Sequence, residues 1–141
     1  DCIMNYFLVN GRKYDVRVTK LEEEFTVLYS ENTGRTIADG APIMLDPLGT
    51  FFGHSISVVG KNGKEKEYDE LYYLLSKPLR VEDEEDALLF EVAHLQTTMA
   101  YRGYVSSGSR SVDRIDENTG KVYWGELNLK IAPIKAQVLP N

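Results

Sequence analysis

The sequence predicts a mainly β (α+β) fold of antiparallel strands with one helix, and three observations predict it. Turn-forming motifs are spread along the chain, the segments between them alternate apolar and polar residues, and a single stretch has helical spacing. This pattern fits an antiparallel β-sandwich or a distorted barrel with one short flanking helix. Residues 1–141 are expected to form a single β-rich domain, because a chain of this length supports one hydrophobic core.

Four turn signals divide the chain. Asn-Gly pairs at residues 10–11 and 62–63 each follow a hydrophobic stretch, and this pair is preferred in tight hairpins because both residues tolerate a positive φ. The segments 31–35 and 117–121 are near-copies of each other, and each contains a glycine that suits the left-handed position of a longer hairpin loop. We therefore expect four hairpins.

The segments between the turns have the pattern of half-buried strands. Residues on the apolar face stand at every second position of three segments: Phe25, Val27 and Tyr29; Phe52, His54, Ile56 and Val58; Tyr123, Leu127, Leu129 and Ile131. A period of two places one face on a core and the other against water or another subunit. Residues 88–95 and 98–106 indicate a further, less regular strand pair.

One segment has the spacing of a helix. Apolar residues stand at positions 68, 71, 72 and 75, and Pro78 follows, so a helix is expected over residues 68–77. Asp69 near its start and Lys77 near its end complement the helix dipole. Because so short a helix is not stable alone, we expect it to cover an open end or edge of the sheet system.

The distribution of charge predicts the order of the strands. The segment 50–60 has no charged residue if its histidine is neutral, so it suits a central position. The segments 12–20 and 121–130 each contain several charges and suit a sheet edge or a polar subunit contact. We expect self-association through sheet edges. The competing interpretation is a monomer whose charged edges prevent such pairing.

Composition excludes several classes of protein. A net charge of −6 argues against direct nucleic-acid binding driven by electrostatics. No apolar run approaches the roughly 20 residues of a membrane-spanning helix, so no membrane partner is expected. No signal peptide is visible, and the start at Asp1 without a methionine indicates a trimmed or excised chain.

The inventory of catalytic groups is thin. Cys2 has no signature of an activated thiol and, as the single cysteine, allows neither an internal disulfide nor a cysteine zinc cage. The stretch 106–109 lacks the Gly-x-Ser-x-Gly elbow and is interpreted as a flexible hairpin tip. Neither the Rossmann nor the P-loop glycine pattern occurs. A glycosidase with two distant carboxylates stays open, but we expect no enzyme, no catalytic residue and no cofactor.

Two histidines and two acidic runs are the remaining candidates for a metal site. His54 and His94 each lie on the apolar face of a strand, and they could meet across the sheet and hold a metal with a carboxylate. We instead expect both to be hydrogen-bonded core residues without a metal. Of the two acidic runs, 22–24 and 82–86, the second is expected to be an exposed loop. Calcium is the less favoured alternative there, because the spacing and glycine of an EF-hand are missing.

Trp124 is the one large aromatic residue with a candidate binding role. It alternates with the apolar set of its strand and is therefore expected on the same face as Glu126, Asn128 and Lys130. An exposed tryptophan on a sheet can stack against a sugar ring or anchor a protein interface. The third interpretation is that a loop or the helix covers it.

A succession of motifs along the chain resembles a known group of proteins. The motifs are FLVNGRKY at Phe7–Tyr14, VLYSENTGR at Val27–Arg35, DPLGTFF at Asp46–Phe52, EYDELY at Glu67–Tyr72 and YWGEL at Tyr123–Leu127. This succession resembles small structural proteins encoded in the tail-gene regions of phages and prophages of Gram-positive bacteria. Tail-tube and tail-hub proteins are among them.

The resemblance implies a non-enzymatic virion component of the tail or baseplate, expressed in the bacterial host cytoplasm. Such proteins have two packed antiparallel sheets or a distorted barrel with a helix at the side. They form hexameric or trimeric rings through edge strands and long hairpins, so the implied partners are further copies and other tail or baseplate proteins. The segment 34–50 is the candidate docking arm, and its shortness favours an accessory or baseplate role. A carbohydrate-binding β-sandwich module that uses Trp124 for a glycan is the alternative.

Overall fold

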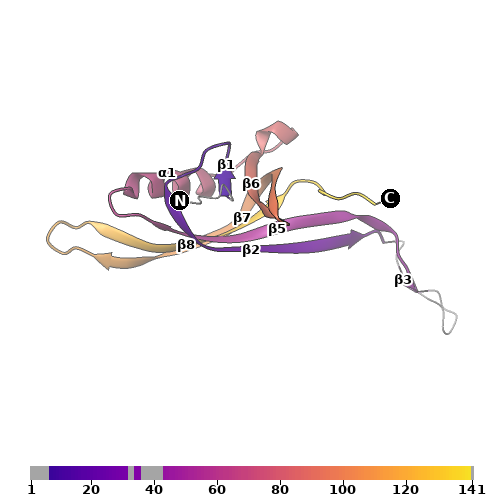
Figure 1. Ribbon diagram of the computed structural model, residues 1–141, viewed down its shortest axis with the longest axis horizontal. Helices are drawn as coiled ribbons and strands as arrows, with labels where there is room; N and C mark the ends of the chain where they lie inside the picture. Colours follow the sequence, from indigo (N-terminus) through magenta and orange to yellow (C-terminus); the bar gives the residue numbers. More distant parts are fainter. Residues whose placement is uncertain (1–6, 32–33, 36–42, 141) are drawn as a thin grey trace.

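The computed structural model describes residues 7–31, 34–35 and 43–140, and its main element is a six-stranded antiparallel sheet (Figure 1). The strand order is β1-β6-β7-β8-β5-β2. The bounds of these strands are Phe7–Val9 (β1), Val16–Tyr29 (β2), Pro47–Gly60 (β5), Leu88–His94 (β6), Thr97–Ile115 (β7) and Val122–Pro133 (β8). Gly34–Arg35 (β3) and Ile43–Met44 (β4) pair separately. The expected mainly β class is confirmed, and the main sheet is not closed into a barrel.

Two arms extend from opposite ends of the sheet (Figure 1). β5 pairs with β8 only over residues 54–58, whereas it pairs with β2 over almost its whole length. The β2–β5 arm therefore continues beyond β8, and the β7–β8 arm continues beyond β5 in the other direction. The C-terminal segment lies along the β2–β5 arm, where Thr50 donates a backbone hydrogen bond to Val138.

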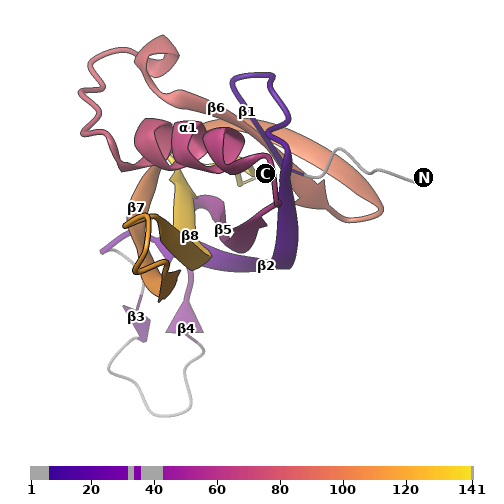
Figure 2. The ribbon, with the colours of Figure 1, turned by 90° about the vertical axis from the view of Figure 1, so that its left-hand side faces the viewer.

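The single described α-helix, α1 (Glu65–Ser76), lies against one face of the curled sheet (Figure 2). It begins three residues before the predicted segment 68–77, since the turn at residues 61–64 leads directly into it. Tyr68, Leu71 and Leu75 of the helix are buried against the sheet. The largest fully buried side chains are Phe90, Ile56, Leu71, Leu127, His54, Val9, Val58 and Val92.

The four turn signals have different outcomes. The turn at 10–11 is confirmed by positive φ angles of 53° at Asn10 and 80° at Gly11, and residues 117–121 form the hairpin between β7 and β8. The hairpin expected at 62–63 is wrong, because this turn joins β5 to α1. Of the segment 31–35, residues 32–33 lie outside the described residues, and β2 is followed there by β3.

Two other expectations about the strands need correction. The pair at 88–95 and 98–106 is confirmed as β6 and β7, but β7 continues to Ile115, so residues 106–109 lie within a strand and are not a hairpin tip. Gly108 fits there because it lies opposite Leu129, whose side chain would contact a Cβ at 3.3 Å. The edge position expected for residues 121–130 is correct for residues 122–126, which pair with β7 alone, and wrong for residues 127–130, which lie between β7 and β5.

The other strand positions agree with the charge pattern. Residues 50–60 belong to β5, which has a partner on each side, and β2, which includes residues 16–20, lies at the edge of the sheet. The acidic run 82–86 is exposed, and its last three residues form a short 3-10 helix, η1 (Glu84–Asp86).

Candidate assembly surfaces

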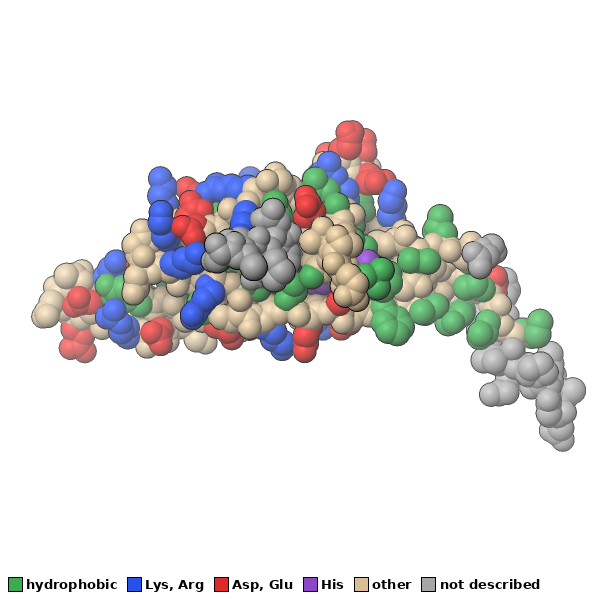
Figure 3. Space-filling view, in the orientation of Figure 1, with side chains coloured by type: hydrophobic (Ala, Val, Ile, Leu, Met, Phe, Trp, Pro, Cys, Tyr) green, Lys and Arg blue, Asp and Glu red, His purple; other side chains and the backbone are tan. Residues whose placement is uncertain are grey.

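Large apolar side chains are exposed along the end of the β2–β5 arm, at the right of Figure 3. We define the arm surface as Phe25, Val27, Leu28, Tyr29, Met44, Leu45 and Leu48, all between 37% and 68% exposed. Two residues of the C-terminal segment, Val138 and Leu139, are exposed nearby, at 49% and 71%. Soluble monomers rarely expose contiguous apolar patches of this kind, so the arm surface is a candidate protein interface.

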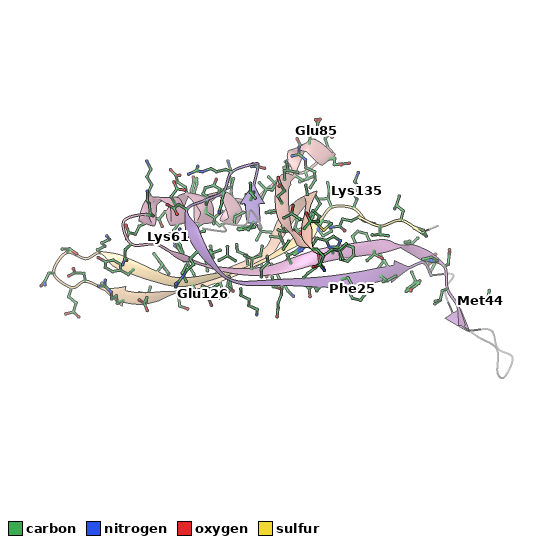
Figure 4. The ribbon with its side chains drawn as sticks, viewed as in Figure 1. Phe25, Met44, Lys61, Glu85, Glu126 and Lys135 are labelled. Atoms are coloured by element: carbon green, nitrogen blue, oxygen red, sulfur yellow. The ribbon has the colours of Figure 1, made fainter. Side chains whose placement is uncertain are left out.

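The arm surface arises because β2 and β5 extend here beyond β8, and the described C-terminal segment contacts β5 only around Thr50 and Phe52. Phe25 and Val27 have the period-two spacing of a half-buried strand, and the sequence predicts a core beneath them. In the structure Phe25 is 68% exposed and has Phe52 as a ring neighbour, with 6.5 Å between ring centres. Figure 4 shows Phe25 and Met44 on the arm, beyond the body of the sheet that carries α1. The segment 34–50 predicted as an arm forms its end, and its residues 36–42 lie outside the described residues.

The edge strand β2 is a second candidate surface. In the described part of the chain, β2 has a strand partner on one side, β5. An exposed edge can pair with a strand of another chain, and charged side chains limit such pairing. Glu22 and Glu24 are 63% and 58% exposed along this strand, where they form ion pairs with Lys20 and Lys130, so the edge combines free backbone groups with exposed charges of both signs.

The two histidines meet at one glutamate of β2. His54 is fully buried, with Nδ1 3.1 Å from the Tyr101 hydroxyl and Nε2 3.2 Å from the carbonyl oxygen of Ala93. Oε2 of Glu23 lies 3.3 Å from the same Nε2 and 2.6 Å from Nδ1 of His94. Since the Ala93 carbonyl can only accept, Nε2–H donates to it and the Tyr101 hydroxyl donates to Nδ1, which is the pattern of a neutral His54.

This histidine cluster joins parts of the sheet that are far apart in strand order. Glu23 lies on β2 and His94 on β6, so their hydrogen bond spans the concave side of the curled sheet. Burial lowers the pKa of His54 from its ordinary value near 6.5, and the hydrogen bond to Ala93 and the charge of Glu23 oppose this effect without reversing it. Burial also raises the pKa of Tyr101, which keeps its hydroxyl neutral.

Among the residues that the structure describes, no group of three histidine, cysteine, aspartate or glutamate side chains has a geometry that could hold a metal ion. The hydrogen bonds of His54 favour the structural role predicted for it, and that role stays a prediction. Cys2 lies outside the described residues. None of the described helices is both long and apolar enough to cross a membrane.

Trp124 lies on the opposite face from the one predicted. A bulge places Gly125 and Glu126 of β8 opposite one residue of β7, so Trp124 moves to the face of Leu127, beneath α1. The guanidinium of Arg110 lies 3.9 Å from the centre of its ring and 3.5 Å from that of Tyr72 on α1.

One face of the Trp124 indole is therefore covered from within the chain, although the residue is 39% exposed. This arrangement favours the internal-cover interpretation over a sugar-stacking platform. Nε and Nη1 of Arg110 are buried without a hydrogen-bond partner, and the guanidinium is surrounded by the π faces of the aromatic rings and by the Asp69 carboxylate, 3.9 Å from Nη1.

A groove lies between the C-terminal end of α1, the segment that follows it, and the sheet. It has a volume of about 660 Å³. Its apolar lining comprises Tyr72, Leu75, Pro78, Leu79, Val81, Leu88, Tyr104, Val105, Leu127, Leu129 and Ile134, and we name it the helix groove. No sequence signal indicated it, because it depends on the path of residues 77–81, which have no periodic pattern.

Comparison with known proteins gives structural similarity alone. No protein-family model matches the sequence, and no curated protein sequence matches it significantly. One similar chain comes from a structure described as the tail of an empty GTA particle with C6 symmetry, with a TM-score of 0.52 and 11% identity, covering 89% of this chain and 84% of that one. Another comes from the virion of a native gene transfer agent (GTA) particle, with a TM-score of 0.54 and 10% identity, covering 96% and 95%. The chain shares the fold of these two virion components along most of its length.

Proposed function

We propose that this chain is a non-enzymatic structural component of a phage-like tail or baseplate, located in the virion. The observation that carries the proposal is the arm surface, a set of large apolar side chains that the described chain leaves exposed. The shared fold with chains of a GTA tail and a GTA virion supports it. A prophage or phage of Gram-positive bacteria as the source rests on the sequence resemblance.

Assembly in this proposal proceeds through protein–protein contacts, with copies of the chain and with other tail or baseplate proteins. The C6 symmetry of the similar GTA tail supports a sixfold ring. The edge strand β2 suits a contact in which the sheet continues into the neighbouring subunit. The arm surface would then be buried by a neighbour, because removing water from its apolar side chains lowers the free energy of the assembly.

Light scattering across a concentration series, with electron microscopy of the same samples, tests this proposal. The wild-type chain should form larger species as its concentration rises. Phe25→Asp combined with Leu28→Asp should shift the equilibrium towards the monomer, because each carboxylate would have to be buried in the contact.

Tyr73→Asp is the matched control. Tyr73 is 75% exposed on α1 and lies outside the arm surface, so this variant should assemble like the wild type. A strictly monomeric wild type at millimolar concentration, also in the presence of neighbouring tail gene products, would contradict the proposal.

A further inference from the structure

We propose that the C-terminal strap, defined as residues 135–140, is a removable cover over one edge of β5. While it is in place, the strap prevents this edge from pairing with a strand of a second copy. The inference rests on the structural role proposed above and adds a control step to the assembly. The covered edge lies in the part of β5 beyond β8, on the side away from β2.

The strap satisfies backbone groups of β5 that β8 leaves unpaired. β8 pairs with residues 54–58 of β5, and the strap continues along the same side at residues 50–52 (Figure 1). The Thr50 N–H donates to the Val138 carbonyl at 2.9 Å, and the Thr50 carbonyl accepts from the Gln137 N–H at 3.0 Å. The strap therefore occupies the place of a neighbouring strand.

At the next position a side chain replaces the backbone of that strand. Oε1 of Gln137 accepts from the Phe52 N–H at 2.9 Å, and Nε2 of Gln137 donates to the Phe52 carbonyl at 3.1 Å. A side-chain amide offers the same acceptor and donor as a peptide group. A strand of another chain can thus form the same hydrogen bonds with Thr50 and Phe52 once the strap has left.

Gly49 lets the strap lie directly over the backbone of β5. A Cβ at this position would come within 2.7 Å of the Ala136 Cβ and within 2.9 Å of the Val138 carbonyl oxygen. Both distances are too short for a side chain larger than that of glycine. The β5 edge is therefore fitted to an extended segment with a small residue opposite Gly49.

Apart from these hydrogen bonds the strap is weakly held. Val138 and Leu139 are 49% and 71% exposed, so they bury little apolar surface. Lys135 forms a 2.9 Å ion pair with Glu84 of the acidic run, and Figure 4 shows it next to the short helix that carries Glu85. Both partners of this ion pair are about half exposed or more, so it adds little stability. Segments with few buried contacts open locally while the rest of the fold stays intact.

Such a cover makes assembly depend on the complete contact between copies. An uncovered strand edge pairs readily with other chains. A segment of the same chain reaches the edge at a high effective concentration, so it excludes a second copy that offers a strand alone. A neighbour that also buries the arm surface gains further binding free energy and displaces the strap.

Hydrogen exchange of backbone amides, measured by NMR on the dilute monomeric chain, tests the release without any assembly. The Phe52 amide should exchange at least about 100-fold faster than the amide of Ile56, which lies between β2 and β8. Equally slow exchange at Phe52 and Ile56 would show that the strap opens only when the whole sheet does. That result would overturn the inference.

Gln137→Glu opens the strap in the full-length chain. The variant keeps an acceptor for the Phe52 N–H but places a carboxylate oxygen against the Phe52 carbonyl, so one hydrogen bond becomes a repulsion. Exchange of the Phe52 amide should become at least about tenfold faster. The concentration at which light scattering detects larger species should fall about tenfold as well, because the loss of the same hydrogen bond favours release.

Gln96→Glu is the matched control. It makes the same change of charge at an exposed residue of the turn between β6 and β7, away from the strap, so both measurements should match the wild type. Faster exchange in Gln137→Glu with an unchanged or higher assembly concentration would overturn the strap as a cover and leave the structural role standing. If wild type and Gln137→Glu both stay monomeric, also with neighbouring tail gene products, both proposals are overturned.

Discussion

Replacing His54 with phenylalanine should destabilise the fold through the groups that it leaves unpaired. In the native structure Nδ1 of its ring is hydrogen-bonded to the Tyr101 hydroxyl and Nε2 to the Ala93 carbonyl. Phenylalanine fills a similar volume but forms neither hydrogen bond. Each buried polar group left without a partner costs about 1–3 kcal/mol, and the additional apolar burial returns part of it. We expect the free energy of unfolding to fall by about 3 kcal/mol.

The control is His94→Phe in the same cluster. Among the described residues Glu23 is the polar partner of the His94 ring, whose side chain is 19% exposed, so the loss should stay near 1 kcal/mol or below, as for partly exposed ion pairs in general. Urea unfolding followed by far-UV circular dichroism measures both variants. A His54→Phe loss no larger than that of His94→Phe would refute the reasoning from unpaired groups.

The same variant tests the pH dependence of stability. Because burial lowers the pKa of His54, the unfolded chain binds its proton near pH 6.5 while the folded chain does not. Stability contributed by neutral His54 is complete above about pH 6.5 and is lost as the pH falls towards the folded pKa, by at most about 1.4 kcal/mol per pH unit.

Glu23, His94 and Tyr101 face His54 in wild type and variant alike, so the difference between the two pH profiles isolates His54. Between about pH 6.5 and 5.5, wild type should lose up to about 1.4 kcal/mol more than His54→Phe. Parallel profiles would show that folding leaves the pKa of His54 unchanged and would contradict the lowering ascribed to burial.

Two further variants test other contacts. Arg110→Ala should cost about 1–2 kcal/mol in the free energy of unfolding and alter the fluorescence of Trp124, the single tryptophan, because it removes the guanidinium between α1 and the β7–β8 arm. Urea unfolding with both probes measures this, and unchanged fluorescence would contradict the stacking. Gly103→Ala should cost about 3 kcal/mol, since its Cβ would overlap the backbone carbonyl of Ala132. Gly63→Ala, with φ of 81° and open space around it, should cost about 1 kcal/mol, and equal losses for the two glycines would contradict the steric argument.

The local sequence pattern was sufficient to predict elements whose structure is determined by residues close together in the chain. The helical spacing around Leu71 and the hairpin at residues 117–121 were predictable because each is determined by a few adjacent residues. The stretch 106–109 was misread because serine and glycine favour turns locally, whereas pairing with β8 keeps it in a strand. The position of Trp124 was missed because one bulge reverses the facing of every residue beyond it.

The candidate site depends on longer-range geometry. Sequence placed His54 and His94 on apolar faces, but their meeting at Glu23 follows from the curl that brings β6 over β2. No spacing along the chain encodes that approach. The helix groove was likewise unpredictable, because it is the space left where residues 77–81 leave the sheet uncovered.

The β2–β5 arm shows that an alternating strand pattern alone does not reveal whether its apolar face is buried within the same chain or against another chain. Phe25 and Val27 alternate with polar residues in the same way as Ile56 and Val58, yet the first pair is exposed and the second fully buried. An alternating pattern indicates that one face of the strand is stabilised by burial. A second chain can provide that burial as well as the same chain can. Under the proposed function, the missing layer over Phe25 belongs to another copy. Burial of this pattern therefore becomes a property of the assembly, and its stability depends on protein concentration.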